Sequence, residues 1–279
     1  MSIGRIVRNM VLASIALGIL VVVWAVGIEP GRLVVRDYAI GLARWPKALD
    51  GYRIAFVTDI HAGSPHITLN YVREIVAETN ALNPDVILLG GDYAIDSIVG
   101  GTKIDAGEIA AVLKGLKARD GVFAVLGNHD NWDNGPRIAR LLEDAGIPVL
   151  EDRAVEVATP RGKYWLVGVS DFETAPHDVA KALAGVSGAT IVLTHSPDVF
   201  PALPDFVALT LAGHTHGGQV YVPFLGRPVV PSRYGQRYVM GVIREGGRTL
   251  FVGSGIGTSI LPVRFLTPPE VSVLTLRSE

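Results

Sequence analysis

The sequence predicts an α/β protein with two packed, partly mixed β-sheets flanked by helices, an α/β/β/α sandwich preceded by one N-terminal transmembrane helix. Three observations support this. An uncharged apolar segment lies near the N-terminus, apolar runs then alternate with helical periodicity, and strand-like runs dominate the second half. With 279 residues, 49% hydrophobic and 19% charged, the composition is typical of a folded protein. We therefore expect an anchor over 1–28, a tether over 29–50 and one domain over 51–279.

The segment Met10–Ile28 carries no charge and is long enough to cross most of a hydrocarbon core of about 30 Å. A retained single-span anchor is the favoured interpretation. A buried core helix is less consistent, because the segment lacks a polar face. A cleaved secretory signal is also considered, since small residues stand at 25–27. The membrane side stays open because arginines flank the segment on both sides: Arg5, Arg8, Arg32, Arg36 and Arg44.

The first half of the domain alternates between strand-like and helical patterns. Short apolar runs at 53–57, 85–89 and 122–126 suit buried strands. Helices are expected between and after them, at 68–82 with Thr68 as N-cap, at 105–117, and at 136–145. This alternation predicts parallel strands joined by right-handed crossovers.

The second half is richer in strands and has one evident helix, at 179–184. Strand-like runs occur at 155–157, 164–169, 190–194, 207–212, 249–252 and 271–276. This change in pattern is the reason for expecting a second sheet rather than one continuous parallel sheet.

Charge and cysteine content exclude several classes of function. The formal net charge of −2 provides no basic field for a nucleic-acid partner, and none is expected. The chain has no cysteine, so disulfides, thiolate metal sites and cysteine nucleophiles are excluded. A metal in this protein must be held by oxygen and imidazole nitrogen.

Potential metal ligands follow five of the apolar runs where each run ends. Taken singly, each is more often a surface pair, a turn or a helix cap. Together they include five of the seven histidines, and ligand sites in α/β sheets lie beyond the carboxyl ends of strands. In extended backbone, residues two apart also point to one side. The sequence therefore predicts a joint metal site at these strand ends, with its donors among Asp59, His61, Asp92, Asn128, His129, Asp130, His195, His214 and His216.

These motifs resemble the calcineurin-like metallophosphoesterase superfamily. They stand as Asp59-x-His61, Gly91-Asp92, 127–130 (GNHD), His195 and 213–216 (GHTH), in the order of that family. The segments 213–220, 253–257 and 261–264 are similar to a subgroup of membrane-associated phosphodiesterases, some of which are UDP-2,3-diacylglucosamine hydrolases. The resemblance implies that 51–279 is a metallophosphoesterase domain, a hydrolase of phosphoric ester or anhydride bonds.

The resemblance also implies a role for each matched residue. Asp59, His61, Asp92 and His216 would hold one divalent metal, and Asp92, Asn128, His195 and His214 the other. A hydroxide bridging both metals would attack the phosphorus, and His129 would act on the substrate phosphate or the leaving oxygen. A mixed nitrogen and oxygen site suits manganese, iron or zinc better than magnesium.

Two departures from the family pattern are visible. Many relatives place a carboxylate three residues after the bridging Asp to orient the catalytic histidine, whereas this chain has Ile95 there and Asp96 next. Asp96 and Asp130 are therefore the candidates for that role. The phosphoprotein phosphatases carry arginines close after these motifs, and none stands in 91–97 or 127–134, which counts against a protein phosphatase.

The segment 221–231 is apolar and rich in proline, which argues against a central strand. It is interpreted either as a buried loop or as a lipid-facing lip, with Arg227 and Arg233 as substrate-binding candidates. The favoured substrate is lipid-linked, such as UDP-2,3-diacylglucosamine. The alternatives are an extracytoplasmic phosphodiesterase acting on soluble or cell-wall substrates, and a metal-binding scaffold without activity.

Overall fold

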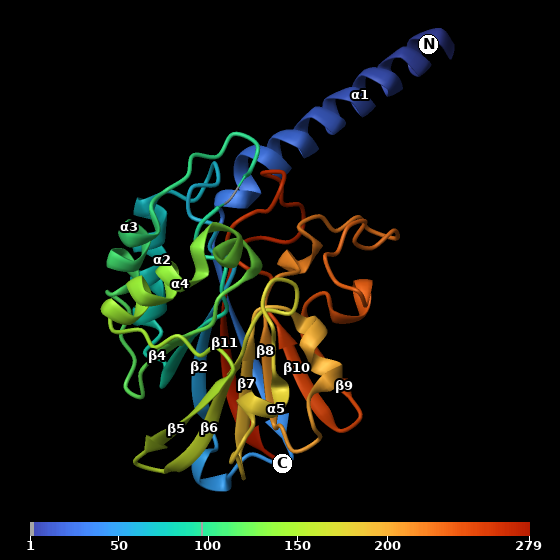
Figure 1. Cartoon of the computed structure of the whole chain (residues 1–279). Coiled ribbons are helices and arrows are strands. Elements are labelled where there is room, and N and C mark those ends of the chain that lie inside the picture. The colour runs from blue at the N-terminus through green and yellow to red at the C-terminus, as the bar shows by residue number, and fades with distance from the viewer. Residues whose placement is uncertain (1–2, 96) are drawn as a thin grey trace.

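The computed structural model describes residues 3–95 and 97–279, and its strands form two sheets that face each other (Figure 1). The first sheet has the order β1-β11-β2-β3-β4 and the second β5-β6-β7-β8-β10-β9. Helices cover the outer faces of this pair. The predicted sandwich of two partly mixed sheets is confirmed.

The first sheet contains the three strands expected in the first half of the domain. They pair in parallel, with Ile54 opposite Val86 and Ile87 opposite Val122. β11 runs antiparallel to β2 and parallel to β1, so the sheet is mixed. The strands are β1 (Val34–Leu42), β2 (Tyr52–Val57), β3 (Val86–Leu89), β4 (Val122–Ala124) and β11 (Glu270–Ser278).

The second sheet has a parallel centre and antiparallel edges. β6, β7, β8 and β10 are parallel neighbours, while β5 and β9 pair antiparallel at the two sides. The strands are β5 (Arg153–Thr159), β6 (Gly162–Val169), β7 (Thr190–Thr194), β8 (Leu209–Ala212), β9 (Gly241–Glu245) and β10 (Arg248–Val252). Between the sheets lies an apolar core that includes Phe56, Leu88, Leu166, Leu211 and Phe251.

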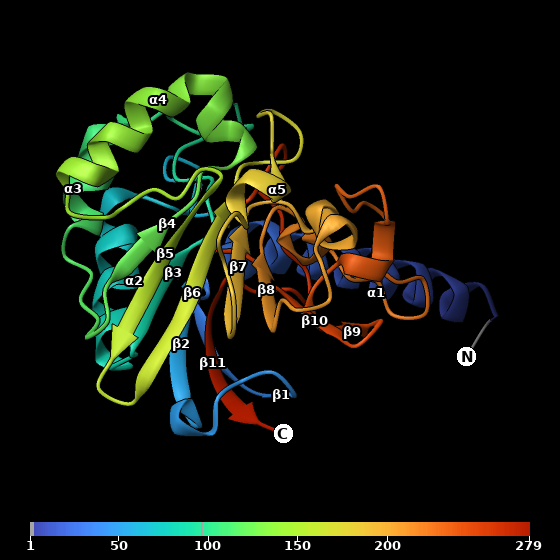
Figure 2. The ribbon, with the colours of Figure 1, turned by 60° about the horizontal axis from the view of Figure 1, so that its bottom comes forward.

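Three helices pack on the outer face of the first sheet, and a short one packs on the second (Figure 2). They are α2 (Leu69–Ala81), α3 (Ala106–Leu113), α4 (Asn128–Asp144) and α5 (Val179–Ala182). The Thr68 hydroxyl accepts a hydrogen bond from the Tyr71 amide at 3.2 Å, which confirms Thr68 as the N-cap of α2.

Two expectations about element boundaries are corrected. The segment 29–50 is not a free tether, because it contributes β1, which pairs along its whole length with β11. The helix expected at 136–145 begins at Asn128 and contains a kink at Asn134, so its first turn already carries predicted site residues. The sequence pattern did not predict this first turn, because Gly135 and Pro136 are residues typical of a helix start.

The N-terminal segment is helical and projects away from the domain (Figure 1). α1 (Ile3–Val23) continues as a π-helical turn (Trp24–Ile28) and a 3-10 turn (Glu29–Gly31). It is long and apolar enough to cross a membrane and is almost entirely exposed, which is inconsistent with a buried core helix. Only its base is fastened to the domain: the buried Glu29 carboxylate accepts the Thr267 amide at 2.6 Å and the Trp24 indole N–H at 2.6 Å.

Candidate metal centre

The predicted ligands meet at one end of both sheets, beyond the carboxyl ends of β2, β3, β7 and β8. Parallel pairing within each sheet brings these ends to the same edge. The buried residues gathered there are Asp59, His61, Asp92, Asn128, His195, His214 and His216. The structure thus brings together all seven side chains that the resemblance implies as ligands.

Four of them surround one point. One ligand atom from each of Asp59, His61, Asp92 and His216 lies within 4.8 Å of the others. The Nε2 atoms of His61 and His216 are 3.1 Å apart, and Asp59 Oδ1 lies 3.5 Å from His216 Nε2. Such convergence of imidazole and carboxylate donors in a buried place fits a divalent cation.

A second group of donors lies against the first and shares Asp92. Asn128 Oδ1 is 3.0 Å from both His195 Nε2 and His214 Nδ1, which are themselves 3.2 Å apart. Asp92 Oδ2 lies 3.3 Å from His195 Nε2 and 3.3 Å from His61 Nε2. One carboxylate oxygen therefore stands between the two groups.

Hydrogen bonds from the surrounding backbone orient these side chains. The His195 Nδ1 atom lies 2.7 Å from the Gly90 carbonyl, so Nδ1 donates to that carbonyl and Nε2 faces the site. Asp59 accepts the His214 amide at 3.0 Å and the Thr58 hydroxyl at 2.7 Å. These contacts fix the orientation of the His195 ring and of the Asp59 carboxylate.

Five of the predicted ligands have left-handed backbone. The φ angles of Asp59, His61, Asp92, His214 and His216 lie between 45° and 68°. The expectation that the Asp-x-His and His-x-His pairs lie in extended backbone is therefore wrong, because the strands end before these residues and the chain turns sharply. Left-handed conformations are costly for residues other than glycine, and they concentrate at functional sites.

Glycines allow the loops of the site to approach one another. A Cβ atom at Gly213 would overlap Thr58 Oγ1 and Asp59 Oδ2, and one at Gly91 would overlap the Gly127 backbone. Gly91 also has a φ of +91°, which side chains rarely adopt. The glycines beside the ligands are thus required by close packing at the centre itself.

Burial and neighbouring charges determine the ionisation of the centre. Burial opposes ionisation of Asp92, but the imidazoles of His195 and His61 hold its pKa well below the ordinary value. Burial, His61 and Arg264 lower the pKa of His216 well below its ordinary value. An ionised carboxylate beside a neutral imidazole is the form in which both groups bind metal.

The Asp130 carboxylate is bound to backbone amides. Its oxygens accept the amides of Asp92 at 2.7 Å, Tyr93 at 3.0 Å and Gly127 at 2.9 Å, so it ties the loop after β3 to the start of α4. Burial and Asp92 raise its pKa to about 7. Asp96, the other candidate for orienting His129, lies outside the described residues.

A cavity of about 260 Å³ opens directly over the centre. Its walls include Asp92, Asn128, His129, His214 and His216. Several further lining residues were not singled out from the sequence, among them Trp132, Glu173 and Ile260. The His129 ring lies edge-on to Trp132 with centroids 4.8 Å apart, a pairing that only the helical turn at the start of α4 creates.

Neither predicted substrate-binding arginine lines this cavity. Arg227 donates to the Gly217 carbonyl at 2.5 Å and to Thr267 Oγ1 at 2.8 Å, so its guanidinium supports the turn after His216. The Arg233 guanidinium lies over the Phe172 ring at 4.6 Å. Their contact with substrate stays a prediction.

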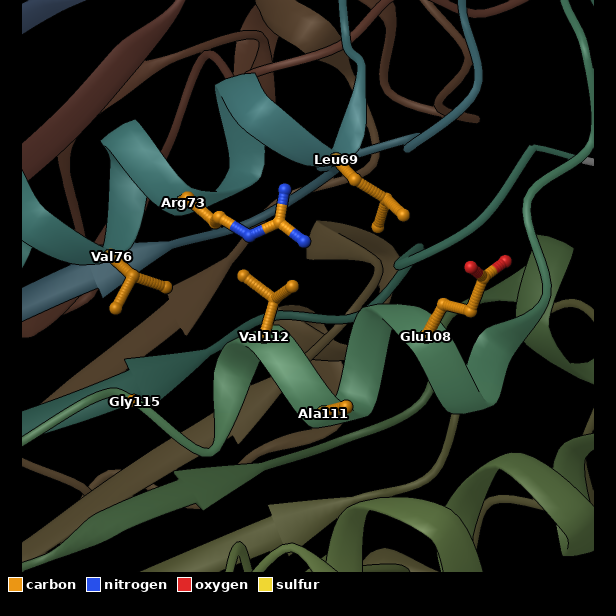
Figure 3. A pocket seen from close by; sticks show the side chains of 7 residues that line it. All are labelled: Leu69, Arg73, Val76, Glu108, Ala111, Val112 and Gly115. Carbon is orange, nitrogen blue, oxygen red and sulfur yellow. The ribbon is translucent and has the colours of Figure 1, made fainter.

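A groove of about 480 Å³ lies elsewhere, between α2 and α3 (Figure 3). The Arg73 side chain reaches across it towards α3, and Leu69 and Val112 provide apolar walls. None of the predicted ligands is among its lining residues. The chemistry therefore belongs to the cavity over the strand ends.

Comparison with known proteins agrees with this geometry. Residues 52–218 match the family model described as calcineurin-like phosphoesterase. The uncharacterized metallophosphoesterase YkuE of Bacillus subtilis (strain 168) is 31% identical over 256 residues, covering 90% of this chain and 88% of the relative. Phosphodiesterase YaeI of Escherichia coli (strain K12) is 33% identical over 232 residues, covering 81% and 82%.

A transmembrane protein with metallophosphoesterase domain from Danio rerio is 31% identical over 293 residues, covering 97% of this chain and 63% of the relative. The matched family segment contains the ligand groups contributed by β2, β3, β7 and β8 and the first turn of α4. The chain therefore belongs to the calcineurin-like phosphoesterase family and is a hydrolase of phosphoric esters.

Proposed function

We propose that this protein hydrolyses a phosphodiester or pyrophosphate bond with two divalent metals, one in each donor group, and with Asp92 shared between them. The position of Asp92 Oδ2, 3.3 Å from both His61 Nε2 and His195 Nε2, carries this proposal. Two such cations, when bound, acidify water and offset the charge that develops on the phosphate. Manganese, iron and zinc fit the mixed donors better than magnesium.

His129 is proposed to act on the substrate rather than on a metal. Its amide donates to Asp92 Oδ1 at 2.9 Å, which holds the first turn of α4 over the shared carboxylate. Its ring lines the cavity between His61 and Trp132. From there an imidazolium can stabilise the phosphate or donate a proton to the leaving oxygen.

We further propose that the substrate is lipid-linked. The cavity over the metal centre adjoins an apolar pocket of about 340 Å³, and the two share Ser259 and Ile260 in their walls. The second pocket is otherwise lined mainly by apolar side chains and backbone, including Val220, Val229 and Leu261. This suits a hydrocarbon chain beside a phosphate, as in UDP-2,3-diacylglucosamine, and α1 as a membrane anchor would bring the site to such molecules.

A second candidate is hydrolysis of soluble or cell-wall phosphodiesters on the outer side of the membrane. The flanking charges of α1 leave its orientation open, and this candidate is favoured if α1 places the domain outside. A silent metal-binding scaffold is disfavoured, since all seven predicted ligands converge and His129 lines the cavity.

The test uses the full chain in detergent, stripped of metal and reloaded with manganese, iron or zinc. We expect metal-dependent hydrolysis of bis(p-nitrophenyl) phosphate. Asp92→Asn should abolish it and lower the bound metal, because the amide cannot bridge two cations as a carboxylate does. The exposed Asp144→Asn variant is the matched control and should behave as the parent.

His129→Gln separates proton transfer from metal binding. Bound metal should stay at the parental level while hydrolysis falls by about 10²–10⁴ on a substrate with a poor leaving group. The loss should be smaller with bis(p-nitrophenyl) phosphate, because its p-nitrophenolate leaving group needs little protonation. Equal losses on both substrates would count against His129 as the acid, and retained metal without turnover of any phosphodiester would favour the scaffold.

The lipid proposal is tested by comparing UDP-2,3-diacylglucosamine with its deacylated analogue. Higher kcat/KM for the acylated molecule would support it. Equal values, together with metal-dependent activity on soluble diesters, would favour the soluble-substrate candidate and leave the two-metal chemistry intact.

A further inference from the structure

Large apolar side chains are exposed on the loops that adjoin the active site. Phe224 is fully exposed, and Leu225 and Ile260 are 77% and 71% exposed. Monomeric soluble surfaces rarely gather such groups in one place. We call this set the apolar rim: Val99, Phe224, Leu225, Val229, Ile260 and Leu261.

Backbone contacts hold the rim together from three separate loops. The Val99 amide donates to the Ile260 carbonyl at 3.3 Å, which joins the loop after β3 to the loop before β11. Val229, Ile260 and Leu261 line the same apolar pocket. The three loops that carry the rim thus meet at that pocket.

The tip of the rim is a tight turn that displays its apolar side chains outward. The Val222 amide donates to the Gly226 carbonyl at 2.8 Å, and the Gly226 amide donates back to Val222 at 2.9 Å. Phe224, at the apex, has a left-handed φ of 71°. A bulky residue in this conformation is unusual. At this position the Phe224 side chain is exposed to solvent and does not pack on the domain.

Short contacts connect the rim to the base of α1. The Arg264 amide donates to the Ala25 carbonyl at 2.9 Å, and the Tyr221 amide donates to the Phe265 carbonyl at 2.9 Å. Segment 264–267 therefore lies between the helix base and the rim loop. Figures 1 and 2 both show the 220–235 loop on the side of the domain from which α1 leaves.

The base of α1 also has residues typical of a membrane interface. Trp24 is partly exposed, and the Arg32 guanidinium lies 5.7 Å from its ring centroid. Indole and guanidinium groups favour the headgroup layer, where one side is apolar and the other wet. This places the membrane surface close to the level of Trp24 and of the adjoining rim.

We infer that the apolar rim inserts into the interfacial layer of the bilayer beside α1, so that the active site opens at the membrane surface. The inference rests on the proposed anchoring of α1, but it does not require a lipid substrate. Ile260 lines both the metal-site cavity and the apolar pocket, so insertion of the rim brings the headgroup region to the cavity mouth.

The absence of cysteine allows a direct test by single-site labelling of the full chain. Leu225→Cys and Val99→Cys report on two different loops of the rim, and Ile15→Cys reports on α1. The exposed Lys163→Cys in β6 is the water-facing control. Each variant is labelled with an environment-sensitive NBD probe and reconstituted in vesicles of phosphatidylcholine and phosphatidylglycerol, after its hydrolysis of bis(p-nitrophenyl) phosphate has been shown to be retained.

Probes at 225 and 99 should show blue-shifted emission, quenching by doxyl-labelled lipid and protection from iodide, relative to the probe at 163. If they match 163 while the probe at 15 is in lipid, the rim inference is overturned and the anchor stands. If the probe at 15 also behaves like 163, both the anchor and the rim inference fail. The readout is independent of whether the substrate is a lipid.

Discussion

At the residue scale, Gly213 shows how closely the metal centre is packed. A side chain there would overlap Thr58 Oγ1 and Asp59 Oδ2. Gly213→Ala should therefore displace Asp59, lower metal affinity and reduce hydrolysis by about 10–100-fold, as for losses of groups that orient metal ligands. Metal titration followed by rate measurement checks this. Gly18→Ala is the control, because a Cβ atom at this position in α1 would have nothing within 4 Å. It should leave both metal affinity and hydrolysis unchanged.

Glu151 should make stability depend on pH. Burial, with Asp152 and Asp171, raises its pKa from 4.5 to about 7, although it accepts the Leu126 amide at 3.0 Å. Folding therefore favours the protonated form, and the stability it contributes below pH 4.5 is lost as the pH rises through 7. The free energy of unfolding of the parent should therefore fall by about 3 kcal/mol between pH 4.5 and 7 through this group, and Glu151→Gln should remove that fall.

Urea unfolding at constant metal concentration, from pH 4.5 to 8, measures this difference. The parent should lose stability relative to Glu151→Gln across that range. Parallel pH profiles for the two proteins would contradict the prediction.

At the element scale, one buried arginine holds the loops that back the metal centre. The Arg264 guanidinium donates to the carbonyls of Ser254, Gly255, Gly257 and Thr267 at 2.6–3.1 Å. The Gly257 carbonyl also lies 3.3 Å from His216 Nδ1. Burial lowers the pKa of Arg264 to about 10. The planar guanidinium group donates to several carbonyls at once, which the single ammonium group of a lysine cannot do.

Arg264→Lys should therefore lower the free energy of unfolding by about 1–3 kcal/mol, since buried carbonyls lose their donors. It should also weaken metal binding at the His216 side. Thermal unfolding and metal titration test both effects. Arg161→Lys, at an exposed position, is the matched control. Unchanged metal affinity in a destabilised Arg264→Lys protein would restrict the role of Arg264 to folding.

At the scale of the whole molecule, the base of the apolar helix belongs to the catalytic domain. Ala25, Glu29 and Pro30 are buried, and Glu29 bonds to Thr267. A chain starting at Trp24 should keep the parental Tm, whereas one starting at Leu33 should unfold several degrees lower because these contacts are lost. Thermal unfolding of the two truncated chains in one buffer tests this prediction. Equal Tm values would show that the base of the helix contributes nothing to the stability of the domain.

Much of the fold was predictable from local patterns. The strand runs at 53–57, 85–89 and 190–194 are continuous apolar segments, as strands buried on both faces must be, and they form β2, β3 and β7. Thr68 was recognisable as a cap because the hydroxyl precedes an amphipathic run. By contrast, β1 was not predicted as a sheet strand, because its pairing with β11 joins opposite ends of the chain.

The sequence by itself determined the α/β class, the apolar N-terminal segment and the choice of the side chains proposed as ligands, because apolar periodicity and donor type are local properties of the chain. Tertiary structure alone decided the left-handed backbone at Asp59 and His61, the position of Asp92 between the two donor groups, and the packing of Trp132 against His129. It also built the apolar rim from three loops. These features depend on contacts between distant segments, and no local pattern encodes a distance.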